Sequence, residues 1–285
     1  MRDIVLLTGC SSGIGAALAV EFHGRGLHVI ATARRIESMA PLAAAGIETH
    51  PLDVDDGPSI AGAVAAVRER HGRLDVLVNN AGFGLFGAAA DLDPAALRRQ
   101  FETNVIAPVQ VARAFLPLML PRRNGRIVNV GSVSGLLTTP FAGAYCASKA
   151  ALHALSDALR LELAPFGIRV VTVQPGAVAS NIGETGTRNL VLPEGSIYGP
   201  VARQVRGRAM ASQKGAMPAS EFARRTVDAV LAPNPPAVFR AGPHSFRFPF
   251  LKRWLPTGFV DRKLARTFGL DRLAGDRQPA RPPQS

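Results

Sequence analysis

Short apolar runs alternate along the first 180 positions with longer segments in which apolar residues recur at helical spacing. Most short runs, such as Ile4–Leu7, are continuously apolar, which is typical of strands buried on both faces of a parallel sheet. The predicted strands are Asp3–Thr8, His28–Ala33, Thr49–Leu52, Leu74–Asn79, Arg126–Val130, Ile168–Gln174 and Ala237–Arg240, and the predicted crossover helices include Gly15–Arg25, Ser59–His71 and Tyr145–Ala164. This order predicts an α/β fold: a single Rossmann-type, doubly wound, mostly parallel seven-stranded sheet with helices on both faces.

Three segments depart from this alternation. Residues 181–220 are dotted with Gly, Pro and Ser without clear periodicity, which predicts a mobile substrate loop with short helices inside a domain spanning residues 1–243. Residues 244–272 form a basic, aromatic C-terminal extension interrupted by Pro249 and Pro256. Residues 273–285 are rich in proline and predicted to be disordered.

Composition and charge narrow the class of protein. The chain has 285 residues, enough for a full core, and only two cysteines, so it needs no disulfide scaffold and fits a reducing compartment. No apolar run reaches the length of a membrane span, and the apolar run near the N-terminus is too short for a secretory signal. These features predict a cytoplasmic protein.

The net charge of +12 raises the question of nucleic-acid binding. Residues 240–285 carry ten Lys/Arg against three Asp, a net of +7, which leaves only +5 for the other 239 residues. Because the excess is confined to the C-terminal tail, nucleic acid is disfavoured as a partner, although the tail keeps that alternative open.

The candidate cofactor loop directly follows the first predicted strand and opens a helix. Glycines at such a turn let the backbone approach a pyrophosphate, and the free N–H groups of the helix N-terminus favour an anion. The spacing, Gly-x₃-Gly-x-Gly, differs from the general dinucleotide motif, so the loop alone is weak evidence. The residues assigned to it are Gly9, Ser11, Ser12, Gly13, Ile14 and Gly15.

A series of motifs in order resembles the short-chain dehydrogenase/reductase family over residues 3–180. The series runs from Thr8–Gly15 through Asn79-Asn80-Ala81-Gly82, Asn104, Ser132 and Tyr145-x₃-Lys149 to Pro175-Gly176, with Tyr145 13 residues after Ser132 and 41 after Asn104. The amino-acid sequences of the glycine loop and of Ala31–Arg35 most resemble those of the hydroxysteroid and retinol dehydrogenase-like branch. The resemblance implies an oxidoreductase whose catalytic residues are Asn104, Ser132, Tyr145 and Lys149.

The chemistry of the Tyr–Lys pair can also be argued from the residues themselves. Four positions apart on a helix, Tyr145 and Lys149 share one face. An ammonium about 5 Å from the phenol, at an effective dielectric constant of about 20, would stabilise the phenolate by about 3 kcal/mol and lower the pKa by about two. Tyr145 would then act as general acid and base. Ser132 would orient the carbonyl oxygen, and the resemblance implies that Asn104 holds a water linking Lys149 to solvent.

Charge after the second strand predicts the cofactor. NAD sites place an acid there for the ribose, whereas this chain has Ala33 followed by Arg34 and Arg35, which favours the phosphate of NADP(H). By resemblance, Asp53 and Val54 contact the adenine; Asn80, Ala81 and Gly82 border the ribose; Tyr145, Lys149, Pro175, Gly176, Val178 and Ser180 complete the cofactor site. No Cys/His/carboxylate cluster has zinc spacing, so no metal is expected.

The predicted substrate is a small molecule, a bulky apolar ketone or secondary alcohol of steroid or retinoid type. Leu85, Phe86, Leu136 and Leu137 are candidate pocket residues. Two alternatives remain open: a non-catalytic regulator that binds NADP(H), and a nucleic-acid binder that uses the basic tail.

Two further expectations concern assembly and the C-terminus. The leucines of the helix from Tyr145 and the family resemblance predict a homodimer or homotetramer. His153, on that helix, is expected at the surface or an interface, and Cys146 in helix packing. Residues 244–272 are predicted to form a lid beside the pocket, with weak peripheral membrane contact as the alternative.

Overall fold

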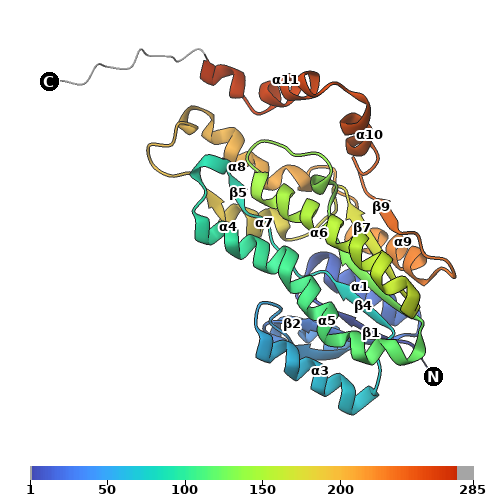
Figure 1. The fold of residues 1–285 in the computed structure, drawn as a ribbon. Helices are drawn as coiled ribbons and strands as arrows, with labels where there is room; N and C mark the ends of the chain where they lie inside the picture. Colours follow the sequence, from blue (N-terminus) through green and yellow to red (C-terminus); the bar gives the residue numbers. More distant parts are fainter. Residues whose placement is uncertain (1, 275–285) are drawn as a thin grey trace.

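Seven parallel strands form the central sheet of the computed structural model, which describes residues 2–274 (Figure 1). Their spatial order is β3-β2-β1-β4-β6-β7-β9, and every neighbouring pair is parallel. The strands are β1 (Ile4–Leu7), β2 (His28–Ala33), β3 (Glu48–Pro51), β4 (Val76–Asn79), β6 (Gly125–Val130), β7 (Ile168–Pro175) and β9 (Val238–Ala241). The predicted fold class is confirmed.

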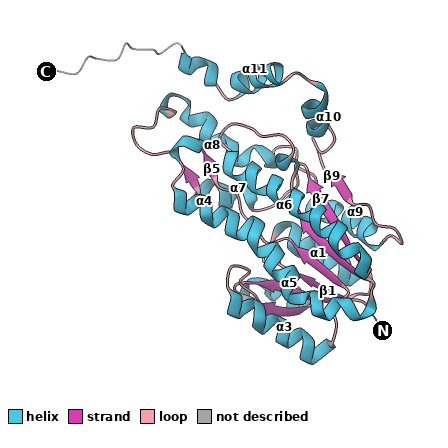
Figure 2. Ribbon diagram, in the orientation of Figure 1, coloured by secondary structure: helices cyan, strands magenta, loops and turns pink. Residues whose placement is uncertain are grey.

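Helices cover both faces because successive strand residues point to opposite sides. In β1, Val5 and Leu7 enter one core with α1 (Gly13–Gly24), α2 (Ala40–Ala44) and α9 (Ala219–Leu231). Ile4 and Leu6 enter the other core with α3 (Gly57–His71), α5 (Ala107–Met119) and α6 (Gly143–Leu163). Figure 2 shows the resulting three layers. Because the inner strands of the sheet contribute residues to both cores, they are apolar on both faces, which is the pattern that predicted the parallel sheet.

The order of the strands reverses between β1 and β4, and this reversal locates the site. Strands β2 and β3 lie on one side of β1, whereas the chain passes to the other side at β4. The loops that follow β1 and β4 therefore diverge at the carboxyl edge of the sheet and leave a crevice, where ligands of doubly wound folds bind.

A smaller region packs above that edge. Residues 181–220 contain α7 (Ile182–Arg188), α8 (Ala202–Met210) and β8 (Leu190–Val191), and β8 pairs with β5 (Phe86–Gly87). The expected short helices are present. The small two-stranded sheet could not be predicted, because each strand has only two residues. The short 3₁₀ segments are Ile36–Met39, Ala89–Asp91, Leu120–Arg122, Val133–Gly135, Ala164–Phe166, Gly199–Val201, Ala211–Gln213 and Leu270–Ala274.

The C-terminal extension folds as two helices, α10 (Arg247–Trp254) and α11 (Thr257–Thr267), above the rest of the molecule (Figure 1). Pro256 separates them, as expected, because it cannot continue a helix. Pro249 lies in the first turn of α10, where its missing N–H costs little. The tail predicted to be disordered begins at residue 273, but residues 273 and 274 close a 3₁₀ segment and residues 275–285 lie outside the described residues.

Within residues 2–274, one helical stretch is long and apolar enough to span a membrane by length and composition. It runs over Pro94–Arg122, through α4 (Pro94–Phe101), the π-helical turn Glu102–Ile106 and α5. More than half of its apolar window is buried inside the fold, and α5 packs on α3 and β4. Core packing thus accounts for its composition.

Candidate active site

The glycine loop between β1 and α1 is shaped by close backbone approach. Gly9 has φ +73°, and a Cβ there would lie 2.8 Å from the Cα of Ala81. A Cβ on Gly15 would lie 2.3 Å from the Gly9 carbonyl oxygen. Ser12 is the N-cap residue of α1, but its side chain makes no capping hydrogen bond. The first N–H groups of α1 therefore face the crevice without a side-chain acceptor. This cradle fits the pyrophosphate of a dinucleotide.

Asn80 ties the loop after β4 to the glycine loop. Its Nδ2 donates to the carbonyls of Thr8 at 3.0 Å and Gly9 at 3.1 Å. In return, the Thr8 hydroxyl accepts the N–H groups of Asn80 and Ala81, each at 3.0 Å. The Asn80 amide therefore holds the loop in shape, while Asn80, Ala81 and Gly82 all line the cavity.

One cavity of about 880 Å³ joins the glycine loop to the region above the sheet. Most residues assigned to the cofactor from the sequence line it: Gly9, Ser11, Ser12, Gly13, Ile14, Gly15, Arg34, Asp53, Val54, Asn80, Ala81, Gly82, Tyr145, Lys149, Pro175, Gly176, Val178 and Ser180. Arg34 is exposed at its rim, directly after β2. Arg35 is the exception, since it is exposed but is not part of the cavity wall.

The far part of the cavity is mainly apolar. Phe86 and Leu137 line it as expected, whereas Leu85 is buried behind it and donates its N–H to Gln100. Leu136 is not part of the wall. Side chains of the C-terminal extension also contribute, among them Phe248, Leu251, Leu255, Val260 and Leu264.

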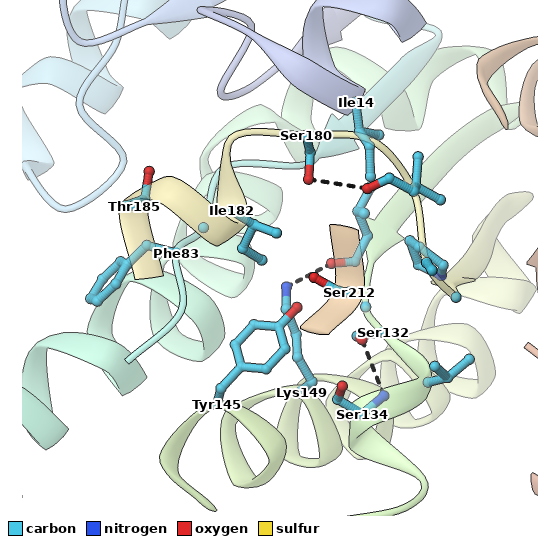
Figure 3. Close-up of a pocket in the computed structure, with 18 of the residues that line it drawn as sticks. Ile14, Phe83, Ser132, Ser134, Tyr145, Lys149, Ser180, Ile182, Thr185 and Ser212 are labelled. Atoms are coloured by element: carbon cyan, nitrogen blue, oxygen red, sulfur yellow. Dashed lines mark hydrogen bonds between the residues drawn. The ribbon is translucent and has the colours of Figure 1, made fainter. Parts of the chain in front are cut away.

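Tyr145 and Lys149 project from α6 into this cavity beside Ser132 (Figure 3). The Lys149 ammonium lies 6.0 Å from the centre of the Tyr145 ring and donates to the Val130 carbonyl at 2.8 Å. The Ser132 hydroxyl accepts the N–H of Ser134 at 3.1 Å and lies near the Tyr145 phenol, where it favours the phenolate. Three of the four predicted catalytic side chains thus share one wall.

Burial reverses the expected direction of the Tyr145 pKa. It raises the pKa of Tyr145 to about 12, although the nearby Ser132 hydroxyl opposes the rise. Burial also lowers the pKa of Lys149 to about 8. The predicted lowering for Tyr145 is wrong in this structure, because desolvation of the phenolate outweighs the effects of Ser132 and of the Arg208 charge, which both lower the pKa. The phenol is therefore neutral near pH 7 and able to donate a proton.

Asn104, the fourth predicted catalytic residue, lies behind the cavity wall in the π-helical turn. Its Nδ2 donates to the Phe83 carbonyl at 3.0 Å and to the Ser148 hydroxyl at 3.1 Å, and its Oδ1 accepts the N–H of Phe83 at 3.1 Å. These bonds fix the loop after β4. Single π turns of this kind recur at functional sites, but the sequence carries no signal for one. The water-linking role remains a prediction.

His153 is buried, so its expected place at the surface or an interface is wrong. Its Nε2 lies 3.4 Å from the N–H of Ser132, and its Nδ1 lies 3.4 Å from the amide nitrogen of Gln174. Burial and the nearby Lys149 charge lower the pKa of His153 to about 4, so the ring is neutral behind Ser132. The signal was available: His153 follows Lys149 by four residues and shares its helix face.

A polar cluster also forms at the opposite edge of the sheet. His28 and His71 contact the same Glu48 oxygen at 2.7 and 3.1 Å, and Arg70 donates to the other oxygen at 2.9 Å. Burial alone would raise the pKa of Glu48, but these hydrogen bonds and the His71 charge hold it below its usual range. The three ligand atoms lie within 4.8 Å of one another, a grouping that sequence spacing does not reveal. The expectation of no metal remains a prediction.

Comparison with known proteins defines the family. The model of the short chain dehydrogenase family matches residues 3–190. The chain is 38% identical to the short-chain dehydrogenase fogD of Aspergillus ruber, over 94% of each protein. It is also similar to the crystal structure of a short-chain dehydrogenase from Streptomyces avermitilis, with a TM-score of 0.78 and 34% identity over 98% of this chain and 99% of the other. The chain belongs to the short-chain dehydrogenase/reductase family.

Two further solved structures carry nicotinamide cofactors. A metagenomic short-chain oxidoreductase in complex with NADP is 37% identical over 62% of this chain and 83% of its own, with a TM-score of 0.58. A family member from Burkholderia phymatum in complex with NAD shares the fold at 24% identity, with a TM-score of 0.74 over 100% and 98% of the two chains. Similar proteins therefore hold either cofactor.

Proposed function

We propose that the protein reduces a carbonyl group to a secondary alcohol with NADP(H), using Tyr145 as proton donor. The observation that carries this proposal is the buried phenol of Tyr145 beside Ser132 and Lys149 in the cavity that the glycine loop opens. A bound nicotinamide cofactor supplies the hydride. Ser132 hydrogen-bonds the carbonyl oxygen, and Tyr145 donates the proton that this oxygen needs as it becomes a hydroxyl. Lys149, on the same helix face, stabilises the phenolate that remains.

NADP(H) is preferred over NAD(H) because of the charge beside the ribose site. Ala33 supplies no carboxylate for a ribose hydroxyl, and Arg34 presents a guanidinium at the cavity rim. Arginine matches a phosphate through two parallel hydrogen bonds. The residues that would hold the rest of the cofactor are the glycine loop, Asp53, Val54 and the wall from Pro175 to Ser180.

The substrate side of the cavity favours a bulky ketone of the steroid or retinoid type. Phe83, Phe86, Leu137 and Ile182 supply apolar walls, and a cavity of about 880 Å³ is large enough for a cofactor end and a multi-ring ligand. Cytoplasmic localisation belongs to the same proposal.

Turnover measurements decide between this proposal and its alternatives. NADPH oxidation would be followed with a panel of ketones that differ in bulk, with NADH as the comparison. We expect turnover that depends on the ketone and is faster with NADPH. NADPH binding without turnover would favour the regulator, and tight binding of nucleic acid without turnover would favour the basic-tail binder.

A lid role for the C-terminal extension gives the first prediction. Truncation after Gly242 should change KM for bulky ketones several-fold in lipid-free buffer, because residues of α10 and α11 line the cavity. Leu251→Ser is the sharper variant, since Leu251 lines the cavity, and Phe250→Ser on the outward face is its matched control with 60% exposure. Steady-state kinetics with bulky and small ketones would test this, and unchanged kinetics on both would contradict a lid.

Peripheral membrane contact is the second candidate role for the C-terminal extension. The outward face of this segment favours that role. Phe246, Phe250 and Trp254 are 60 to 70% exposed, with Lys252 and Arg253 between them. Such a surface suits an anionic bilayer. If contact with lipid is its role, Phe250→Ser loses co-sedimentation with anionic vesicles while its kinetics in buffer stay unchanged.

Assembly into a dimer or tetramer is also proposed. Leu152 and Leu163 are buried within the chain, which weakens the sequence argument, but Ile106, Leu155, Leu161 and Phe166 remain 38 to 66% exposed on α6 and beside it. Sedimentation of the wild-type protein should give a species of at least 60 kDa, twice the 30.0 kDa of the chain. A 30 kDa species at every concentration would contradict assembly, and Leu161→Glu should shift the protein toward that species.

A further inference from the structure

Arg208 is a buried cation inside the cavity. It lies on α8, is 9% exposed and lines the cavity beside Phe86. Its Nε donates to the Thr139 hydroxyl at 2.9 Å, and its guanidinium carbon lies 5.3 Å from the centre of the Phe86 ring. In the described part of the chain, no ion pair includes Arg208.

A guanidinium in this position is unfavourable without a ligand. Arginine stays protonated and carries five N–H donors, of which the contact with Thr139 uses one. Burial lowers the pKa of Arg208, whereas the nearby Cys146 and Tyr145 raise it. A buried charge without a counterion opposes folding, and an apolar side chain of similar size would pack there at less cost. The remaining donors are therefore available to an anion that enters the cavity.

The charges along the cavity wall support an anionic ligand. The basic lining residues are Arg34, Arg99, Lys149, Arg208, Arg247 and Lys263, and the acidic ones are Asp53 and Asp55. Both acids follow β3, beside the proposed adenine site, so the substrate side has only cations among its charged lining residues. A field of one sign inside a low-dielectric cavity attracts ligands of the opposite charge.

The position of Arg208 relative to Tyr145 sets the geometry of such a ligand. Both side chains contact the Phe86 ring, with the Tyr145 ring centre 5.9 Å from the Phe86 centre and the Arg208 guanidinium 5.3 Å from it. Tyr145 and Arg208 therefore border the same aromatic ring in the cavity wall, so a single ligand beside Phe86 would contact Tyr145 through its ketone oxygen and Arg208 through an anionic group.

We propose that Arg208 determines specificity by binding an oxyanion on the substrate, a carboxylate or a phosphate carried by the bulky ketone. This inference rests on the proposed carbonyl reduction and deepens it, because it changes the expected substrate from a neutral ketone to an acidic one. Arginine suits the role, since its planar donors match both oxyanions in a bidentate manner.

Matched ketones test this proposal. The substrates are 4-acetylbenzoate, its methyl ester and 4-acetylphenyl phosphate, with saturating NADPH and the holoenzyme. We expect wild type to favour one or both anions over the ester, mainly through KM. Arg208→Met should lower kcat/KM for the favoured anion by about 30-fold and leave the ester within about threefold, as expected for loss of a charged hydrogen-bonded pair. The two anions separate the carboxylate from the phosphate.

Two variants control for structural effects. Arg208→Lys keeps the charge but not the bidentate geometry, so it should retain part of the preference for the anion. Arg206→Met removes an exposed arginine from the same helix and should change none of these ratios. Equal losses for anion and ester in Arg208→Met would mean that the guanidinium only pins α8 to Thr139 and Phe86, and would overturn the proposal. Wild type that favours the ester would overturn it as well.

Binding separates failure of this inference from failure of the proposed function. If no ketone is turned over, carbonyl reduction of these compounds is wrong, but the melting temperature of the NADPH-loaded protein still reports binding. A shift with 4-acetylbenzoate or 4-acetylphenyl phosphate that exceeds the shift with the ester, and disappears in Arg208→Met, would support the oxyanion site. The same shift for all three compounds in wild type would overturn it.

Discussion

Replacement of Tyr145 by phenylalanine is expected to lower kcat for carbonyl reduction more than tenfold while NADPH still binds. The substitution removes only the hydroxyl, and the ring keeps its contact with Phe86 at 5.9 Å between centres. Without the phenol, no group in the same position donates a proton to the carbonyl oxygen beside Ser132. A tenfold loss corresponds to about 1.4 kcal/mol of transition-state stabilisation. The measurements are kcat with saturating NADPH and the dissociation constant for NADPH by fluorescence titration.

The second tyrosine of the chain offers a matched control. Tyr198 packs edge-on against Phe141, with the ring centres 5.8 Å apart, and is not part of the cavity wall. Tyr198→Phe should leave kcat within about twofold, since it removes a hydroxyl from outside the site. If Tyr145→Phe keeps more than a tenth of the wild-type kcat, Tyr145 is not the proton donor. If both variants lose activity equally, the loss reflects packing rather than chemistry.

The central sheet could be predicted because its strands are apolar on both faces. His28–Ala33 is predicted and observed with the same bounds, and the last strand, predicted at Ala237–Arg240, is observed at Val238–Ala241. Strand β5 could not be predicted, since two residues, Phe86 and Gly87, contain no periodicity. The π-helical turn around Asn104 is equally invisible, because it depends on packing against the loop after β4 and on no local residue preference.

The sequence predicted which residues form the candidate site, but it did not predict their pKa values. Spacing brings Ser132, Tyr145 and Lys149 together, because a helix fixes residues four apart on one face. The pKa of Tyr145 was predicted in the wrong direction, since Coulomb attraction can be estimated from spacing but desolvation cannot. Arg208 has no signal at all. Its burial arises only when α8 folds over Phe86, which is far away in the sequence.

The second large effect is expected from Arg34→Asp. Arg34 lies at the cavity rim immediately after β2, where a ribose phosphate of NADP(H) would be bound. A carboxylate at this position repels that phosphate and accepts a ribose hydroxyl of NAD(H) instead. Loss of a charged hydrogen bond and gain of a repulsive charge should lower the ratio of kcat/KM for NADPH to that for NADH by about 100-fold.

Arg35→Asp is the matched control for this change of cofactor preference. It introduces the same charge one residue further on, at an exposed position that is not part of the cavity wall. Its effect on the ratio should therefore be small and should disappear at high salt, because exposed charges are screened over about 10 Å at 0.1 M ionic strength. Equal shifts in both variants would indicate a general field effect, and an unchanged ratio in Arg34→Asp would mean that Arg34 points to solvent. A large shift in Arg34→Asp alone, preserved at high salt, would place position 34, and not position 35, next to the ribose phosphate.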